Sequence, residues 1–175
     1  YYSENAVFFS GYIQDKLEYQ SFIMNAGLRY DSFDPQSTHI DSLLNPEHGL
    51  VKSTKKNMIS PRIGVAYPIT DEGILHFSYG HFYQMPTMRN LFLKNIFGAG
   101  LSPTIGYSDL KPQKTVMYEF GLQQQLSRYI AINGSLFYKD IRDLLALQTI
   151  NYNSPTYGPS SYSVYLNKDY SMVKG

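Results

Sequence analysis

Residues 60–80, SPRIGVAYPITDEGILHFSYG, alternate between two kinds of side chain with a period of two, which is the spacing of a β-strand. Ile63 and Val65 before the turn, and Leu75 and Phe77 after it, fall on one face. The other face is small, weakly polar and almost uncharged, whereas a soluble hairpin usually exposes Lys, Glu and Thr there. The pattern predicts a β-hairpin and raises the question of which solvent its apolar face meets.

The same alternation recurs along the chain and predicts about seven strands, joined alternately by tight turns and long connections. The strands are expected at residues 5–17, 20–33, 60–70, 73–80, 115–126, 129–141 and from about 168 onward. The long connections are expected at residues 34–57, 81–114 and 142–168.

Strand length and loop asymmetry together favour a transmembrane barrel. Strands of about 11 to 14 residues exceed the usual 5 to 6 of globular proteins and match a tilted crossing of the hydrocarbon layer. Connections in compact soluble domains rarely reach the length of these three, whereas outer-membrane barrels combine short periplasmic turns with long outer loops. The fold class is therefore predicted to be all-β, a segment of an antiparallel transmembrane β-barrel with Ile63, Val65, Leu75 and Phe77 facing lipid. A large soluble β-sandwich with one buried face is the alternative.

Composition agrees with a membrane strand protein. The chain has 17 Tyr and 10 Phe but no Trp, a content that suits strands at a boundary between apolar and wet surroundings. A net charge of +1 gives no field that would gather nucleic acid, and the absence of Cys removes thiolate metal sites. The uncharged run at residues 144–167 contains Pro155, Gly158 and Pro159, which exclude a membrane-spanning helix there. No signal peptide is expected at residues 1–10, and the chain is expected to be a piece of a longer protein.

Four segments carry a resemblance to a known family. They are ISPRIGVAYPIT (59–70), HFSYGHFYQMPTMRNLF (76–92), SDLKPQKTVMYEFGLQ (108–123) and GSLFYKDIRDLL (134–145). In this order they resemble the C-terminal part of the barrel of TonB-dependent outer-membrane receptors. The chain departs from the family pattern at Tyr107-Ser108, where Asn-Pro is usual, at Gln113, where Glu is usual, and at Gln84-Met85 before the proline. These departures leave the ligand class open.

The resemblance implies a barrel of about 22 strands, of which residues 1–175 would form part, in the outer membrane of a bacterium. It further implies a plug domain upstream of this chain and import of a scarce ligand, such as an iron chelate, a vitamin, an oligosaccharide or a peptide. Energy would be relayed by the TonB complex through the upstream part. The implied partners are outer-membrane lipid, the plug, TonB and, in some importers, a surface lipoprotein.

Candidate functional residues fall into two groups. Side chains expected to face the lumen, where they would meet the plug or the ligand, are Arg29, Asp31, Arg62, His76, Glu119 and Lys139. An outer loop at residues 81–94 is expected to grip an anionic or sugar-like ligand through Tyr83, Gln84, Arg89, Asn90 and Lys94. Either group also fits ordinary lumen or solvated loop side chains.

No enzyme and no metal site are predicted. His39, Asp41, Glu47 and His48 lie in a polar loop at spacings that match no helix-borne ligand pair. Asp140 and Asp143 lie beside Lys139 and Arg142, which indicates a solvated rim rather than an acid–base pair, and no cofactor motif is present. Two other functions remain open: a structural scaffold barrel whose outer loops bind a partner protein, and a passive porin with an open lumen.

Overall fold

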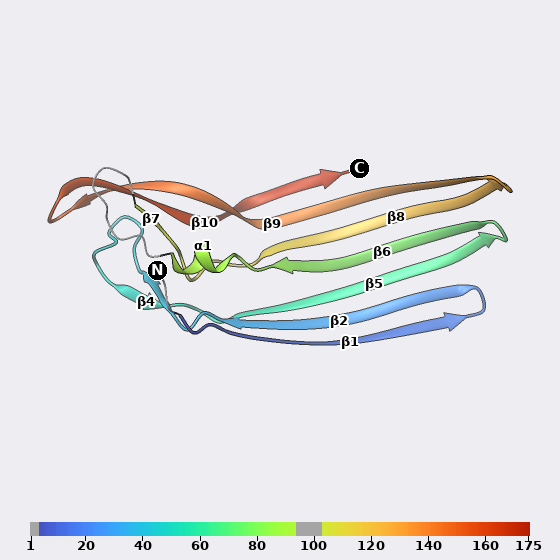
Figure 1. Cartoon of the computed structure of the whole chain (residues 1–175), viewed down its shortest axis with the longest axis horizontal. Helices are drawn as coiled ribbons and strands as arrows, with labels where there is room; N and C mark the ends of the chain where they lie inside the picture. Colours follow the sequence, from blue (N-terminus) through green and yellow to red (C-terminus); the bar gives the residue numbers. More distant parts are fainter. Residues whose placement is uncertain (1–3, 94–102) are drawn as a thin grey trace.

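The computed structural model describes residues 4–93 and 103–175. In that part of the chain the dominant element is one large sheet of eight strands, seven of them long (Figure 1). The long strands are β1 (Val7–Tyr19), β2 (Phe22–Asp34), β5 (Lys56–Thr70), β6 (Gly73–Gln84), β8 (Gln113–Ser127), β9 (Ile130–Ser154) and β10 (Gly158–Lys174). The predicted all-β class and the prediction of about seven strands are confirmed.

Sequence neighbours are also spatial neighbours in this sheet. Its strand order is β1-β2-β5-β6-β8-β9-β10-β7, and every pair of long neighbours is antiparallel. Tight turns at residues 20–21, 71–72 and 128–129 lie together at one end of the sheet, and the longer connections lie at the other (Figure 1). This asymmetry is the one expected of an outer-membrane barrel, with the end of the longer connections outside the cell.

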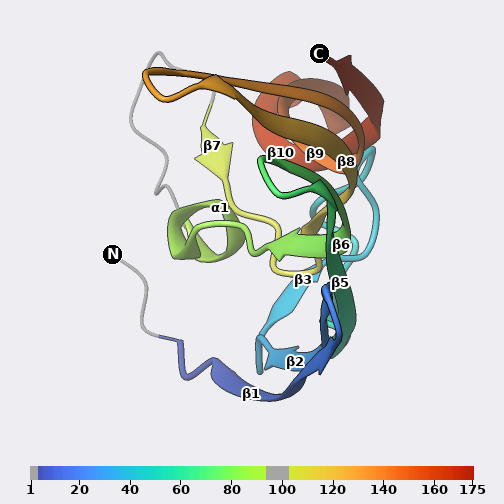
Figure 2. The same cartoon turned by 90° about the vertical axis from the view of Figure 1, so that its right-hand side faces the viewer.

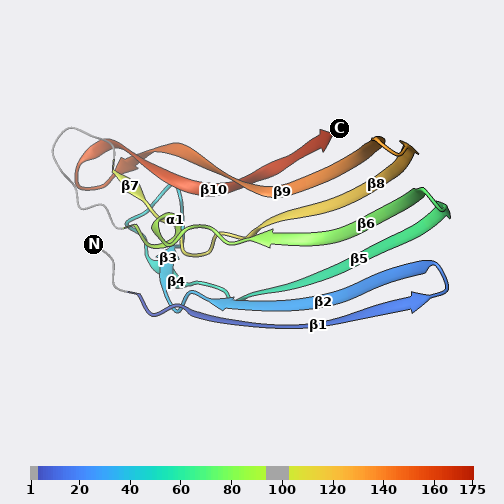
Figure 3. The same ribbon diagram turned by 45° about the vertical axis from the view of Figure 1, so that its right-hand side comes forward.

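The shorter elements all lie at the outer end (Figure 3). A two-stranded sheet of β3 (Thr38–Ile40) and β4 (Leu50–Lys52) interrupts the connection between β2 and β5. Between β6 and β8 lie helix α1 (Met88–Phe92) and β7 (Thr104–Ile105), which pairs in parallel with β10. In the described ranges no helix has the length and hydrophobicity needed to cross a membrane.

The sheet is strongly curved, and its two faces differ in chemistry. Viewed along the strands, it forms an arc with α1 and β7 on the concave side (Figure 2). Phe33 and Met58 pack against Leu91 and Phe92 of α1, so the strand positions in phase with these two residues face the concave side. The register then places an apolar band on the convex side, with rows such as Val65, Phe77, Phe120 and Leu136.

The convex band has no protein cover among the described residues. Ile13, Ile59 and Leu136 are 73%, 57% and 69% exposed, and no second sheet packs against them. A soluble sandwich would bury such a band under its second layer, so that alternative is not supported. The buried clusters lie instead at the outer end, one around α1 and one between β10 and the β3–β4 connection.

The prediction of a third long connection at residues 142–168 is wrong. Strands β9 and β10 keep one register from the pair Tyr138 and Lys174 to the pair Ser154 and Gly158 at the tip. The segment is therefore a long hairpin that extends beyond the barrel wall. Asp143 adopts a positive φ of 56°, and the amide nitrogen of the Asn167 side chain donates to its carbonyl oxygen at 2.9 Å. The Pro and Gly residues that suggest a loop are confined to the hairpin tip and its flank.

Candidate ligand path on the concave face

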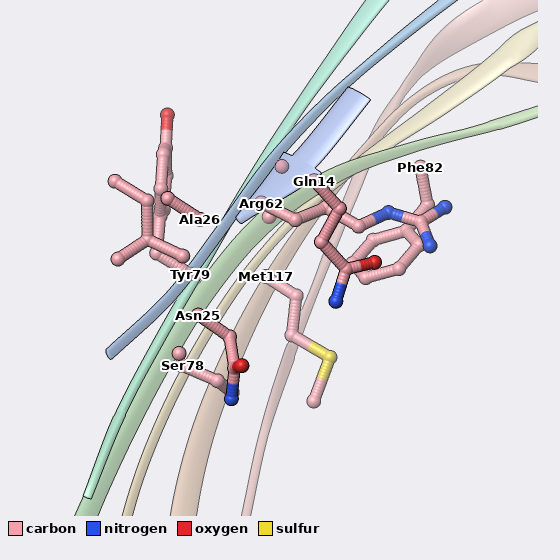
Figure 4. A pocket seen from close by; sticks show the side chains of 12 residues that line it. Gln14, Asn25, Ala26, Arg62, Ser78, Tyr79, Phe82 and Met117 are labelled. Atoms are coloured by element: carbon pink, nitrogen blue, oxygen red, sulfur yellow. The ribbon is translucent and has the colours of Figure 1, made fainter. Parts of the chain in front are cut away.

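The predicted lumen residues share the concave face. Arg29 and Gly27 lie two residues apart in β2 and therefore point to the same face, and Gly27 is in register with Arg62 on β5. His76 and Glu119 occupy neighbouring rows of that face. Figure 4 shows Arg62 on the same side of the sheet as Gln14, Asn25, Ser78, Phe82 and Met117, whereas Ala26 and Tyr79 lie on the other side. The strand alternation read from the sequence therefore places these side chains together, while their function stays a prediction.

Two arginines on this face have different surroundings. The Arg29 guanidinium donates to the Asp31 carboxylate through Nε and Nη2, at 2.8 Å each, and the Asp31 side chain is only 10% exposed. Arg62 has no acidic partner among the described residues, and its guanidinium carbon lies 4.7 Å from the centroid of the Phe82 ring. Arg29 is thus neutralised by its neighbour, and Arg62 is a cation available to another group.

Arg62 borders a hollow in the concave wall (Figure 4). The hollow has a volume of about 370 Å³, and its floor includes Gly27, Gly64 and Gly80. A Cβ added at Gly64 would meet no heavy atom within 4 Å, so the missing side chain there leaves open space. A cation beside a recess of this size forms a place where an anionic group could dock.

The predicted loop residues are only partly brought together. Tyr83 and Gln84 are not loop residues: they end strand β6, where they pair with Lys114 and Gln113, and as consecutive strand residues they point to opposite faces. Arg89 and Asn90 lie in α1, whose N-terminus is capped by the hydroxyl of Thr87. The Arg89 side chain is exposed, and Lys94 lies outside the described residues.

Helix α1 is held against the outer end of the concave face by its own apolar residues and by the returning chain. Leu91 and Phe92 are 2% and 4% exposed. The amide of Gly106 donates to the carbonyl of Leu93 at 2.7 Å, and that of Tyr107 donates to the carbonyl of Asn90 at 2.9 Å. These contacts hold α1, and with it Arg89, at the mouth of the concave face.

Sequence reasoning missed a clamp formed by residues 108–111. The carboxylate of Asp109 accepts hydrogen bonds from the Thr54 amide and hydroxyl, at 2.7 Å each, and from the Lys56 ammonium at 2.6 Å. The Lys111 backbone exchanges hydrogen bonds with the Asn167 side chain on β10. The segment therefore ties the start of β5 to β10. Its sequence, SDLK, belongs to one of the segments that resemble the family. Nothing in that sequence identifies its hydrogen-bond partners on β5 and β10, because they lie 53 or more residues away along the chain.

The ionisation of Asp109 reflects this clamp. Burial by itself would raise the pKa of the Asp109 carboxyl, but the hydrogen bonds from Lys56 and Thr54 and the positive charge of Lys56 outweigh it and lower the pKa below its ordinary value. The carboxylate is thus the form that the clamp stabilises.

A second set of contacts joins the β3–β4 connection to the outer hairpin. The Tyr162 hydroxyl donates to the Leu43 carbonyl at 2.7 Å, and the Ser154 hydroxyl donates to the Glu47 carboxylate at 2.6 Å. Burial, with the nearby Tyr152 and Tyr107, raises the pKa of Tyr162 to about 12. The outer connections are thus held by specific contacts.

Each of the four polar residues weighed as metal ligands has a side-chain partner in the structure. His48 contacts Asp41 at 3.0 Å, His39 contacts the Ser53 hydroxyl at 3.2 Å, and Glu47 binds Ser154. Within the described ranges, no group of three or more His, Cys, Asp or Glu side chains is placed to hold a metal ion.

Comparison with known proteins gives the family. The model of the "TonB dependent receptor-like, beta-barrel" family matches residues 1–175. No protein of curated function matches the sequence.

The chain also resembles solved structures, at identities that show the fold. A mutant of the ferric enterobactin receptor of Pseudomonas aeruginosa in complex with enterobactin matches with a TM-score of 0.71 and 18% identity, covering 97% of this chain and 24% of that one. The hemophore receptor HasR of Serratia marcescens, in complex with its hemophore and heme, gives 0.71 and 17%, covering 98% and 31%. The copper transporter OprC gives 0.59 and 18%, covering 97% and 26%.

The extent of these matches defines what the chain represents. It spans about a quarter of the length of the first of these receptors and contributes an open, curved part of a barrel wall. The family consists of transport receptors rather than enzymes. The chain belongs to the TonB-dependent receptors of the bacterial outer membrane, and it forms part of their β-barrel.

Proposed function

We propose that the protein containing this barrel segment actively imports a scarce ligand with anionic groups, using energy relayed by TonB. The observation that carries the proposal is Arg62, a cation without an acidic partner in the described residues, which borders a hollow on the concave wall. Family membership supports a plug domain and a TonB partner for the whole protein. Iron chelates are the first ligand class to test, because two of the structurally similar proteins are a ferric enterobactin receptor and a hemophore receptor.

The concave face offers two further groups to such a ligand. Arg89 is exposed on α1 at the outer mouth, and Gln84 is exposed at the end of β6. An anionic chelate would meet Arg89 first and Arg62 deeper along the wall, through charge-assisted hydrogen bonds. The ordering of these residues from mouth to wall supports a path rather than a single closed site.

The test is uptake of a ferric catecholate chelate by cells that carry the full-length protein, with and without a functional TonB. We expect uptake to require TonB and the variant Arg62→Gln to lower the apparent affinity about tenfold, the effect of losing one charge-assisted contact of about 1.5 kcal/mol. Arg128→Gln is the matched control, because Arg128 lies in the tight turn after β8 at the opposite end of the sheet.

Other outcomes would select another function. Uptake that persists without TonB and rises in proportion to the external concentration would indicate a passive porin. Absence of uptake of any tested chelate, vitamin, oligosaccharide or peptide, together with stable capture of a surface protein by the outer loops, would indicate a scaffold.

A further inference from the structure

Three segments lie together at the outer end of the sheet (Figure 3). They are the β3–β4 connection, the clamp segment and the outer hairpin, which is the part of β9 and β10 beyond Asp143. The Tyr162 hydroxyl joins the outer hairpin to the β3–β4 connection. The Asn167 side chain joins the same hairpin to the Lys111 backbone of the clamp segment. The remaining pair, the clamp segment and the β3–β4 connection, is joined through Ser108.

A directional chain of hydrogen bonds passes through Ser108. The Ser108 hydroxyl donates its single hydrogen to the Thr38 carbonyl at 3.0 Å, so it accepts in its 2.6 Å contact with the Ser53 hydroxyl. Ser53 has then used its own hydrogen, and it accepts in its 3.2 Å contact with Nδ1 of His39. The His39 ring therefore carries a hydrogen on Nδ1. Both serines are buried, so their hydroxyls depend on these bonds in place of water.

One apolar cluster also takes side chains from all three parts of the outer end. Its buried members belong to the outer hairpin, and Val164 among them is fully buried. Leu43 of the β3–β4 connection packs against this cluster, and so does Tyr107, which directly precedes the clamp segment. Tyr107 packs against the cluster around α1 as well. Apolar contacts therefore follow the same pairings as the hydrogen bonds.

A closed ring of contacts makes the separate release of one segment unfavourable. Each segment has two partners, so the first segment to leave breaks two of the three joints. Each of the two that stay then keeps one joint, and when either of them leaves the last segment has none. Release of one segment therefore weakens both others, which is the condition for a cooperative unit of local unfolding.

We infer that the β3–β4 connection, the clamp segment and the outer hairpin form one cooperative unit, which opens and closes as a whole at the mouth of the concave face. Helix α1 belongs to the unit, because the Tyr107 amide donates to the Asn90 carbonyl. Contact of another molecule with any one segment would order the other two as well. The inference concerns the coupling between outer segments and holds whatever the barrel imports.

Hydrogen exchange of the full-length protein in detergent micelles tests the unit with two variants, each lacking one hydroxyl. Ser108→Ala interrupts the joint between the clamp segment and the β3–β4 connection, and leaves the hydrogen bonds of the outer hairpin intact. Tyr162→Phe interrupts the joint between that connection and the hairpin, and leaves those of the clamp segment intact. In both variants the protection factors of the backbone amides should fall about five- to tenfold in all three segments, the effect of one lost buried hydrogen bond.

The matched control is Ser127→Ala, because the Ser127 hydroxyl accepts from the Tyr129 amide in a tight turn at the opposite end of the sheet. It should leave the three outer segments unchanged. The amides of β2 and β5 within the membrane report on the folded wall and should keep their protection in both test variants. Four results would overturn the inference: no loss in any segment, losses confined to the two segments that share the deleted bond, losses that extend to the wall, or equal losses in Ser127→Ala.

Discussion

Glycine positions in the strands differ sharply in what a side chain would meet. A Cβ at Gly121 would lie 2.1 Å from Nε2 of His76, the residue paired with it on β6. A Cβ at Gly134 would meet nothing within 4 Å. Gly121 is therefore the space in which the His76 ring lies on the concave wall, while Gly134 has no such role.

Substitution by alanine should separate these two positions. Gly121→Ala must displace the ring of the half-buried His76, and we expect a loss of about 0.5 to 1.5 kcal/mol in unfolding free energy, the cost of moving a side chain away from its preferred rotamer. Gly134→Ala should be neutral or slightly stabilising, because it restricts the unfolded chain at no steric cost. Urea unfolding of the full-length protein in detergent measures both, and equal effects would show that His76 does not need the space.

Which residues share the concave face can be read from strand alternation alone, as Arg62 and Glu119 show. The partners of each side chain cannot be read from the sequence in this way. The sequence suggests loop positions for Tyr83 and Gln84, because polar Gln113 and Lys114 look like connection sequence, yet these four residues pair as the outer end of β6 and β8.

At the scale of elements, the outer connections are joined by contacts that the local sequence does not encode. Strands within the membrane must alternate, because one face meets lipid. Beyond the membrane that requirement ends, so the outer part of β9 and β10 shows no clear alternation and resembles a loop in sequence. Only the pairing of Ser154 with Gly158 and the packing of Val164 reveal it as a hairpin.

The clamp at Asp109 should depend on pH in a defined direction. Its folded-state pKa lies below the ordinary value of 3.8, so the carboxylate contributes stability above that value. This contribution is lost as the pH falls through the folded-state pKa. The protection factors of the backbone amides in the clamp segment, which compare the measured exchange rate with the intrinsic rate at the same pH, should therefore fall below about pH 4. Asp109→Asn should show the lower protection factors already at neutral pH.

The control for this prediction lies in the same region. Asp41, whose exposed contact with His48 holds no other element, should leave the exchange unchanged when replaced by Asn. Unchanged exchange in Asp109→Asn would show that backbone contacts alone hold the clamp segment.

At the scale of the whole molecule, the two faces of the sheet should respond oppositely to charge. Leu136 is on the convex band and Ser135 is its concave neighbour on β9. Leu136→Lys should destabilise the full-length barrel in phosphatidylcholine vesicles by about 1 to 4 kcal/mol, because a cation on the lipid face costs about 2 to 4 kcal/mol at the bilayer midplane and less toward the interfaces. Ser135→Lys should change the unfolding free energy by less than about 1 kcal/mol, because lumen positions do not meet hydrocarbon. Similar losses for both would contradict the assignment of the faces.

The barrel class is predictable because strand period, strand length and loop asymmetry agree over the whole chain. The overall curvature and the position of α1 inside the arc are not predictable from the sequence, because both depend on packing between residues distant in sequence, such as Met58 and Leu91.

Strand β7 sets a limit on how the sheet can continue. It pairs in parallel with Ser163 and Val164, on the edge of β10 that β9 does not occupy. A further wall strand that follows this edge outward from the membrane cannot form ladder hydrogen bonds with Ser163 and Val164, because β7 already pairs with them. A two-residue segment therefore works as a stop for strand addition, fixing the upper end of the next ladder and shielding this stretch of the β10 edge from the sheet of another molecule.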